Sequence, residues 1–566
     1  MTSLRLLPAL LLALAFGRAG AESFPPVRAT KGMVAADNAT ASAVGAQMLV
    51  QGGDAVDAAV ATALMLGVLQ PFASGIGGGG FAVVRRADGT ALALDFREVA
   101  PAGASRDMYL DKKGEVIPKA STRGPRAAGV PGEVAGLFEL HRRYGKLPWK
   151  KVVAPAVKAA TDGFPAGELL HRRVTAARAE LAANPALAKD FLTADGKPIP
   201  IGGTVRRPAL GRTLTAISER GAAGFYEGKV AHAIGDAMKK DGGLITAADL
   251  AAYRAKERPL VQGDAFGYHI LSMPPPSSGG AVLLQVLRVL DGTDLKALGH
   301  NSSPYLHRLT EALKHAFADR AEVMGDPDFT PVPLDALIGD ATVARVRAAF
   351  DPHTTLPRSA YGGKYGLPED GGTSHLCTLD AEGNAVAMTS TVNTSFGSMY
   401  VAGDTGVLLN DQMDDFVAKP GVPNAFGLVG REANTIRPGK RPLSSMTPTI
   451  VLRDGKVVLV VGASGGPTII TGTLQVLLNV LVFGMDVRSA VEAPRVHHQW
   501  VPEVLMVEPT LATDVRDGLR RRGHTIYVAG RFTAVQAIVN GPKGMSAASD
   551  PSKLGRPAGV DEIGGR

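Results

Sequence analysis

The pattern of apolar and polar positions changes character near residue 373. Before this point apolar residues recur mostly with the helical period, and after it they alternate with the period of strands. Helices are predicted over 39–51, 55–69, 131–144, 303–324, 341–350 and 468–483. Hairpins are predicted from 373–379 with 385–393 and from 450–453 with 456–461. Helices early and strands late, without regular βαβ alternation, indicate a layered α+β architecture.

Two glycine-rich segments need separate interpretation. Four glycines at 77–80 precede a predicted strand, whereas a phosphate-binding loop precedes a helix, so we expect backbone that packs closely against another segment. The tail from 546 to 566 is rich in Gly, Pro and Ser, and we expect it to be loosely held.

Composition and charge narrow the classes of function. The 566 residues are 45% hydrophobic and 20% charged, and the net charge of +8 comes from scattered Lys and Arg. The short basic runs at 141–143 and 520–522 contain no aromatic residues, which argues against nucleic-acid binding. Cys377 is the only cysteine, so internal disulfides and cysteine metal clusters are excluded, and we expect it to be a buried apolar residue. No metal or other cofactor is predicted.

The N-terminus has the pattern of a secretory signal peptide. Arg5 precedes an apolar run over 6–16, and the segment 17–21 (GRAGA) that follows ends in a small-x-small cleavage site after Ala21. We therefore expect a signal peptide at 1–21, a mature chain from Glu22 and a periplasmic or secreted location. An uncleaved membrane anchor stays open as the alternative. No later segment has the roughly 18 uninterrupted apolar residues of a membrane span.

A candidate nucleophile stands at the start of the first predicted hairpin, in 371–375 (GGTSH). A threonine hydroxyl becomes a good nucleophile when its own free α-amino group serves as the base, which requires the preceding peptide bond to break. The charged, glycine-rich segment 358–372 is predicted to be an exposed, mobile loop that can leave after cleavage. The pattern therefore suggests autocleavage between Gly372 and Thr373, although such a tripeptide is weak evidence by itself.

Longer motifs strengthen this interpretation. They are 393–397 (NTSFG), 410–416 (NDQMDDF), 441–446 (RPLSSM) and 462–466 (GASGG), with others at 77–81, 95–98, 275–279, 318–320, 493–495 and 497–500. In this order, over about residues 30 to 550, the chain resembles the bacterial γ-glutamyltransferases (glutathione hydrolases) of the N-terminal-nucleophile hydrolase superfamily.

The resemblance implies a four-layer αββα sandwich formed jointly by two autocleaved subunits. The large subunit would be 22–372 and the small catalytic subunit 373–566, associated as a heterodimer. Thr373 would form an acyl-enzyme with the γ-glutamyl group of glutathione or a related compound. The acyl group would then pass to water or to an amino acid or peptide.

The resemblance also implies roles for particular residues. Thr391 would support the nucleophile, and the backbone N–H groups of Gly465 and Gly466 would form the oxyanion hole. The donor's α-carboxylate would bind to Arg97, Ser444 and Ser445, and its α-ammonium to Asn393, Gln412 and Asp415. The segment 419–430 matches a lid loop in bacterial members, but it carries Phe426 where Tyr is common, and Phe cannot latch the lid by a hydroxyl hydrogen bond.

Three other interpretations stay open. The segment 462–466 fits the G-x-S-x-G pattern of a serine hydrolase, in which Ser464 would act with His497, His498 or His524. A cephalosporin or glutaryl-amide acylase, or an enzyme acting on poly-γ-glutamate, would keep the superfamily and change the substrate. A non-catalytic binding protein is the third, and the complete set of site residues argues against it. Asp415 argues against the acylases, because an acyl group without an α-ammonium has no use for that carboxylate.

Overall fold

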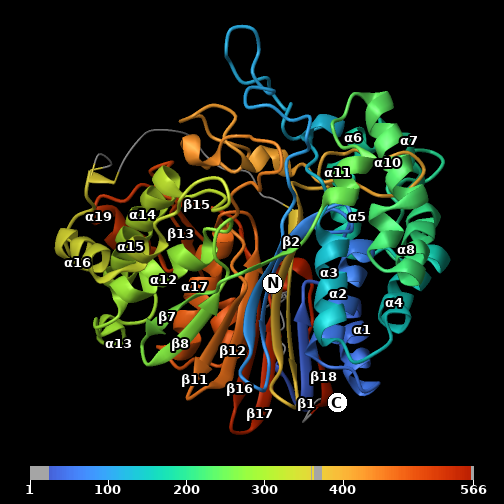
Figure 1. Ribbon diagram of the computed structural model, residues 1–566. Helices are drawn as coiled ribbons and strands as arrows, with labels where there is room; N and C mark the ends of the chain where they lie inside the picture. Colours follow the sequence, from blue (N-terminus) through green and yellow to red (C-terminus); the bar gives the residue numbers. More distant parts are fainter. Residues whose placement is uncertain (1–24, 358–359, 362–371, 563–566) are drawn as a thin grey trace, which may run out of the picture.

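The computed structural model describes residues 25–357, 360–361 and 372–562, and Figure 1 shows them as a layered arrangement of strands between two groups of helices. Thirteen strands of the described chain form one antiparallel sheet. In spatial order they are β6 (Lys256–Arg258), β3 (Ala91–Phe96), β2 (Gly79–Arg85), β10 (Ala385–Asn393), β9 (Gly372–Asp380), β1 (Val27–Ala36), β17 (Gly544–Ser549), β16 (Ala534–Gly541), β12 (Lys456–Ser464), β11 (Thr449–Arg453), β8 (Tyr268–Ser272) and β7 (Val261–Ala265), with β18 (Ala558–Glu562) also paired to β1.

The two halves of this sheet pack face to face. The ring of His375 on β9 lies so close to β12 that a Cβ on Gly462 would be 2.2 Å from it. Side chains of both halves share one core, in which Phe81 and Leu379 join Val460 and Ala463. This contact makes the two inner layers of a sandwich.

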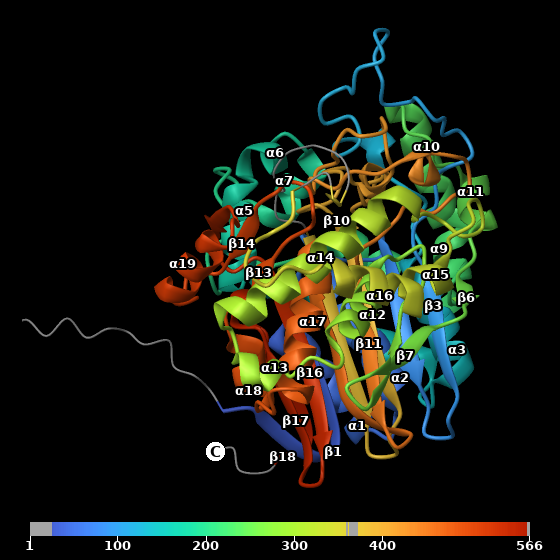
Figure 2. The ribbon, with the colours of Figure 1, turned by 90° about the vertical axis from the view of Figure 1, so that its left-hand side faces the viewer.

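Helices form the two outer layers (Figures 1 and 2). One layer contains α1 (Ala39–Val50), α2 (Ala55–Leu69), α3 (Glu133–Tyr144), α4 (Trp149–Asp162), α5 (Glu168–Ala176), α6 (Arg178–Ala182), α7 (Pro185–Phe191), α8 (Pro208–Arg220), α9 (Ala223–Tyr226), α10 (Gly228–Asp241) and α11 (Ala247–Ala252). The other contains α12 (Gly279–Leu290), α13 (Leu295–Leu298), α14 (Ser303–Val323), α15 (Leu334–Ile338), α16 (Asp340–Ala349), α17 (Thr468–Leu481), α18 (Val487–Glu492) and α19 (Thr513–Arg521). The predicted αββα class is confirmed. The remaining strands make two small sheets, β13 (Val496–His497) with β14 (Leu505–Val507) and β15 (Ile526–Val528), and β4 (Phe164–Pro165) with β5 (Thr204–Val205).

Local sequence explains several of these elements. Asp54 begins α2 with a capping box completed by Asp57, and Asn38 caps α1 through its side chain. The 77–80 glycines bring β2 against its neighbours: a Cβ on Gly77 would lie 2.0 Å from the Leu408 carbonyl oxygen, and one on Gly78 would lie 2.0 Å from that of Thr391. They are therefore packing backbone, as predicted.

The C-terminal tail differs from expectation. The composition of 546–566 predicts a loosely held tail, but its described part, up to residue 562, contributes to β17 and β18, which both pair with β1 in the central sheet. Backbone pairing there does not depend on large side chains.

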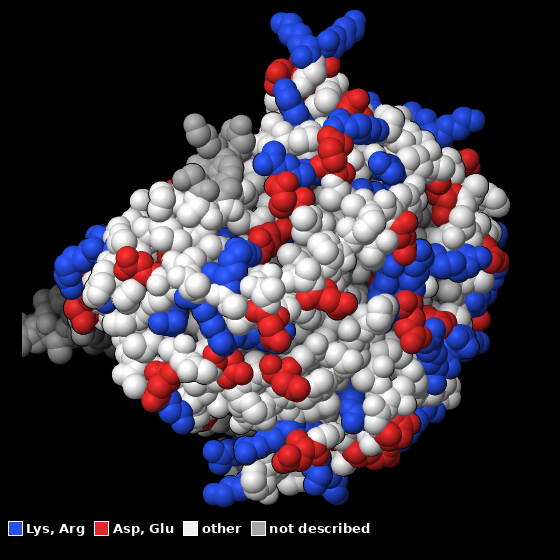
Figure 3. Space-filling model, turned by 60° about the vertical axis from the view of Figure 1, so that its left-hand side comes forward, with Lys and Arg blue, Asp and Glu red and all other residues white. Residues whose placement is uncertain are grey.

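Two predictions fall outside the described residues, namely the signal peptide at 1–21 and most of the loop 358–372. Among the described helices, none combines the length and the apolar character that crossing a bilayer requires. On the face drawn in Figure 3, Lys and Arg are interspersed with Asp and Glu rather than gathered in one basic patch.

Candidate active site

Thr373 is the second residue of β9, and the hairpin with β10 places it directly opposite Thr391. The two hydroxyl oxygens are 3.1 Å apart. The Thr391 hydroxyl donates to the carbonyl oxygen of Gly372 at 2.6 Å and accepts from the Asn393 N–H at 2.8 Å. A hydroxyl has one proton to donate, so the bond between the two threonines must be donated by Thr373. The resulting chain holds the Thr373 oxygen beside the carbonyl of the peptide bond that precedes it.

A pocket with an empty volume of about 330 Å³ opens at this hairpin. Its wall contains nine of the ten residues predicted for substrate binding and chemistry, and these come from six separate segments of the chain. They are Arg97, Thr373, Thr391, Asn393, Gln412, Asp415, Ser444, Ser445 and Gly466. Gly465, the tenth, directly precedes Gly466. The structure therefore brings the predicted set together in one place.

The turn between β12 and α17 supplies free donors. Gly465 and Gly466 have φ angles of +136° and +59°, and a Cβ on Gly466 would lie 2.8 Å from the ring of Phe426. Only glycine fits both the conformation and the space. Within the described residues, neither N–H group donates a hydrogen bond. Because Gly466 lines the same pocket as Thr373, its N–H is available to an oxyanion formed there.

Ser464 has a different environment from that of a serine nucleophile. Its hydroxyl donates to Asp37 at 3.2 Å and approaches the Ala534 carbonyl oxygen at 3.4 Å. In the described part of the chain no histidine hydrogen bonds to it. The triad needed by the serine hydrolase interpretation is therefore not assembled there.

The residues predicted to bind the two charges of an amino acid form an ion pair with each other. Arg97 follows β3 and is buried, and its guanidinium contacts the carboxylate of Asp415 and the Pro442 carbonyl oxygen, the latter at 3.2 Å. Asp415 also accepts a hydrogen bond from the Gln412 side chain at 2.8 Å. A cation and an anion side by side match the α-carboxylate and α-ammonium of an amino acid.

Several polar atoms at this end of the pocket have no partner among the described residues. The Ser445 hydroxyl and the Gln412 side-chain oxygen are buried without a hydrogen bond. The Asn393 side-chain N–H donates to the Asp411 carbonyl oxygen at 3.0 Å, and this leaves the amide oxygen as an acceptor. Buried polar atoms are normally satisfied, so these mark positions that a ligand can complete.

Glu98 lies beside this ion pair and was not predicted as part of the site. Burial raises the pKa of Glu98 to about 8, so its carboxyl is protonated at neutral pH. The nearest oxygen is 3.9 Å from the Arg97 guanidinium. The DFRE motif at 95–98 contained this residue, but the sequence alone did not reveal its burial.

The predicted lid loop covers the pocket without a tyrosine. Phe426 is buried against Gly466, and its carbonyl oxygen accepts from the Gln499 side chain at 3.1 Å. The Asn424 side chain accepts from the N–H groups of Phe426 and Leu428 at 3.0 and 3.1 Å. The loop is therefore fixed by Asn424 and Gln499, in place of a hydroxyl latch at 426.

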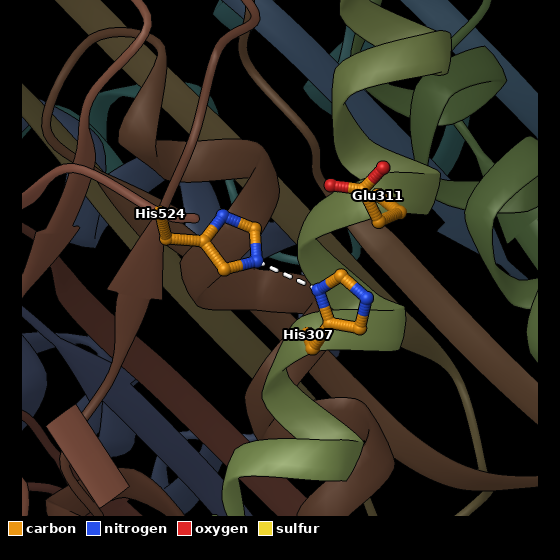
Figure 4. Close-up of side chains that lie close together, drawn as sticks. All are labelled: His307, Glu311 and His524. Carbon is orange, nitrogen blue, oxygen red and sulfur yellow. Dashed lines mark hydrogen bonds between the residues drawn. The ribbon is translucent and has the colours of Figure 1, made fainter. Parts of the chain in front are cut away.

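A second cluster of potential ligands lies away from this pocket (Figure 4). His307 and Glu311 project from α14 toward His524, and their donor atoms lie within 4.8 Å of one another. The two imidazoles share a hydrogen bond of 2.7 Å, and the other His307 nitrogen contacts the Asp351 carbonyl oxygen at 2.7 Å. Glu311 accepts from Thr355, Tyr361 and Lys314. These side chains satisfy one another's hydrogen-bonding groups and join segments that are far apart in the chain. The sequence analysis did not predict this cluster.

Comparison with known proteins agrees with this geometry. The family model described as Gamma-glutamyltranspeptidase matches residues 41–560. A glutathione hydrolase proenzyme of Escherichia coli is 45% identical over 533 residues, covering 94% of this chain and 92% of the relative. Glutathione hydrolase 2 of Arabidopsis thaliana is 41% identical and covers 93% of both chains.

Two solved structures are similar as well. A cephalosporin acylase from Bacillus halodurans superposes with a TM-score of 0.84 at 28% identity, over 98% of this chain and 99% of that chain. A γ-glutamyltranspeptidase of Helicobacter pylori gives a TM-score of 0.56 at 42% identity, over 57% of this chain and 92% of that chain.

Proposed function

This chain belongs to the γ-glutamyltranspeptidase family, and we propose that Thr373 is the nucleophile with which it cleaves both itself and its substrates. It is a self-processing γ-glutamyl transferase and hydrolase. The observation that carries the assignment of Thr373 is the pocket in which this threonine shares a wall with Arg97, Asp415 and Gly466.

Self-cleavage uses the hydroxyl chain at the hairpin. The Thr373 oxygen attacks the Gly372 carbonyl carbon, and the Thr391 hydroxyl stabilises the developing charge on the carbonyl oxygen, to which it already donates at 2.6 Å. The C–N bond breaks as the Thr373 nitrogen takes a proton, which leaves an ester between Gly372 and the Thr373 oxygen. Water hydrolyses this ester and releases the Gly372 carboxylate, the hydroxyl and the α-amine of Thr373.

The mature enzyme repeats the attack on a γ-glutamyl amide. The free amine of Thr373 accepts the hydroxyl proton as the oxygen attacks the γ-carbonyl. The N–H groups of Gly465 and Gly466 stabilise the oxyanion, and the proton passes to the departing amine. Water then hydrolyses the acyl-enzyme, or the amine of an amino acid or peptide takes the acyl group.

Substrate recognition follows from the charged and polar side chains that line the pocket with Thr373. The guanidinium of Arg97 and the hydroxyls of Ser444 and Ser445 bind the α-carboxylate. The carboxylate of Asp415 and the amide oxygens of Gln412 and Asn393 bind the α-ammonium. The unpartnered atoms of Ser445 and Gln412 support this assignment. The names of the relatives support glutathione as a donor.

A cephalosporin or glutaryl-amide acylase is the other candidate. The similar structure of a cephalosporin acylase supports it, because the two proteins share a fold. Its acyl groups differ from γ-glutamyl by lacking the α-ammonium. They would leave the oxygen of Gln412 without a donor and the carboxylate of Asp415 with Arg97 as its only ion-pair partner in the described chain, which is unfavourable. The higher identity to glutathione hydrolases also supports the γ-glutamyl donor.

We further propose that cleavage yields subunits of 22–372 and 373–566, which remain associated as a heterodimer. The segment 1–21 is proposed to be a signal peptide that directs the protein to the periplasm or out of the cell.

The decisive experiment compares wild type with Thr373→Ala and Thr373→Ser by intact mass and N-terminal sequencing. Wild type should give two associated chains, the smaller beginning at Thr373. The alanine variant should stay whole, and the serine variant, which keeps a hydroxyl, should mature more slowly than wild type. Hydrolysis of a γ-glutamyl anilide by the mature protein then tests the donor. Normal maturation of Thr373→Ala would refute the assignment of the nucleophile.

A further inference from the structure

A buried ion pair lies directly beneath the nucleophile, outside the set predicted from sequence. Asp37 follows β1, and Lys553 ends the short helix at Pro551–Lys553 near the other end of the chain. The Lys553 ammonium donates to the Asp37 carboxylate at 2.8 Å, and it also donates to the backbone carbonyl oxygen of Thr373. The Asp37 side chain is fully buried and that of Lys553 is 11% exposed. A lysine is rarely buried without a specific partner, and here one of its partners is the nucleophile's own residue.

The carboxylate of Asp37 is held from several directions. It accepts from the Gln536 side chain at 2.5 Å, from the Ser464 hydroxyl at 3.2 Å and from the His375 N–H at 3.3 Å. Ser464 directly precedes Gly465 and Gly466, and His375 is two residues beyond Thr373. Asp37 therefore ties the strand that carries the nucleophile to the turn that carries the free N–H donors.

We propose that Lys553, held in place by Asp37, is a positioning residue that fixes the Thr373 backbone relative to the Gly465–Gly466 turn. This inference rests on the proposed role of Thr373. Lys553 holds the carbonyl group on one side of the Thr373 Cα, and this sets the directions of the nitrogen and of the hydroxyl-bearing Cβ, which are bonded to the same Cα. Neither contact involves the peptide bond between Gly372 and Thr373, so both can persist when that bond is cleaved. Lys553 contacts the backbone of the nucleophile and is not among the residues that line the substrate pocket.

The pair also sets the charge around the free amine of the mature enzyme. The ammonium of Lys553 is bound to the Thr373 residue itself, whereas the carboxylate of Asp37 reaches only as far as His375. The nearer charge is thus positive, and it favours the neutral amine that serves as the base. The other ionisable groups nearby are the Arg97–Asp415 pair in the pocket and the His375 ring, whose pKa burial lowers to about 3, so that ring is uncharged.

The test compares Lys553→Met, Lys553→Arg and Asp37→Asn with wild type, and Lys543→Met, an exposed lysine of the same C-terminal region, is the control. Three measurements are made on each protein: the rate of conversion to two chains, the melting temperature, and kcat and KM for a γ-glutamyl anilide from pH 5 to pH 10. Conversion does not depend on the identity of the substrate. An uncleaved or inactive wild type would therefore contradict the proposed function, whereas the comparison among variants tests the role of Lys553.

We expect Lys553→Met to lower kcat at least tenfold with KM changed less than threefold, and Lys553→Arg to restore most of the loss. The acidic limb of kcat should move up by about one pH unit in Lys553→Met and down in Asp37→Asn, because one variant removes the nearer cation and the other its counter-ion. If Lys553→Met stays uncleaved while Lys553→Arg matures at the same melting temperature, the proposal is also supported. It is overturned if Lys553→Met behaves like Lys543→Met, if both Lys553 variants are equally impaired, or if both acidic limbs stay at the wild-type position.

Discussion

We predict that Asp415 decides which acyl donors the pocket accepts. Its carboxylate pairs with the Arg97 guanidinium and accepts from the Gln412 side chain at 2.8 Å, and its side chain is 11% exposed. Replacement by asparagine keeps the shape and removes the negative charge. The change should therefore act on donors that carry an α-ammonium and leave donors without one largely unaffected.

The magnitude follows from the kind of bond that is lost. A hydrogen bond to a charged group contributes about 1.5–3 kcal/mol, which corresponds to a factor of about 10 to 150 in kcat/KM. Asp415→Asn should lose this factor with a γ-glutamyl anilide and less than about threefold with a glutaryl anilide, which differs only by the missing amine. The variant should also melt at a lower temperature, because Arg97 is buried and the neighbouring Glu98, with a pKa of about 8, is uncharged at neutral pH.

The assay measures kcat/KM at pH 7.5 for both anilides. Asp414→Asn is the matched control, since the adjacent Asp414 binds the Ser121 hydroxyl at 2.7 Å and is not among the residues that line the pocket of Thr373. Equal losses with the two donors would refute the proposal that Asp415 recognises the α-ammonium. That result would favour the glutaryl-amide acylase as the function.

Three other changes test separate parts of the site. Thr391→Val removes the donor to the Gly372 carbonyl and should slow conversion of the precursor about a hundredfold, as measured by gel electrophoresis, while Thr391→Ser should convert normally. Gly466→Ala puts a methyl group 2.8 Å from the Phe426 ring at a φ of +59° and should lower kcat by about a hundredfold; a loss below threefold would contradict the oxyanion role. Glu98 releases its proton as the pH rises through its pKa of about 8, and the new anion 3.9 Å from Arg97 competes with the donor's carboxylate. KM should therefore increase several-fold from pH 7 to pH 9.5 in wild type and increase less in Glu98→Gln, in which only loss of the donor's α-ammonium raises it.

The site was predictable to the extent that its chemistry lies in short contiguous motifs. Thr373, Asn393, Asp415, Ser444 and Gly466 each belong to a run of several unusual residues, and a run can be matched without knowledge of the fold. Their convergence on one pocket was an inference from the resemblance, and the structure confirms their proximity. Their chemical roles remain predictions.

The parts that the sequence concealed depend on contacts between residues far apart in the chain. Asp37 and Lys553 are separated by 516 positions, and each is unremarkable where it stands. His307 and His524 meet across 217 positions in the same way. Burial of Glu98, and with it the shifted pKa, likewise depends on which segments pack around it. Periodicity and local composition report none of these distances.

The arrangement of strands explains how the protein can break its own chain and stay folded. The proposed cleavage after Gly372 would separate only the first residue of β9 from the rest of the strand. Its pairing with Asn393 lies beyond an irregularity in the ladder, and the pairs from Thr373 to Leu379 would be unchanged. Strands from either side of the cut alternate in the central sheet: β2 pairs with β10, β9 with β1, β1 with β17 and β18, and β11 with β8. Separating the proposed subunits would break all of these ladders and open the shared core between the sheet halves. We therefore expect the two chains to co-migrate in gel filtration without denaturant and to separate only when the whole sheet unfolds; dissociation of cleaved protein under native conditions would contradict this.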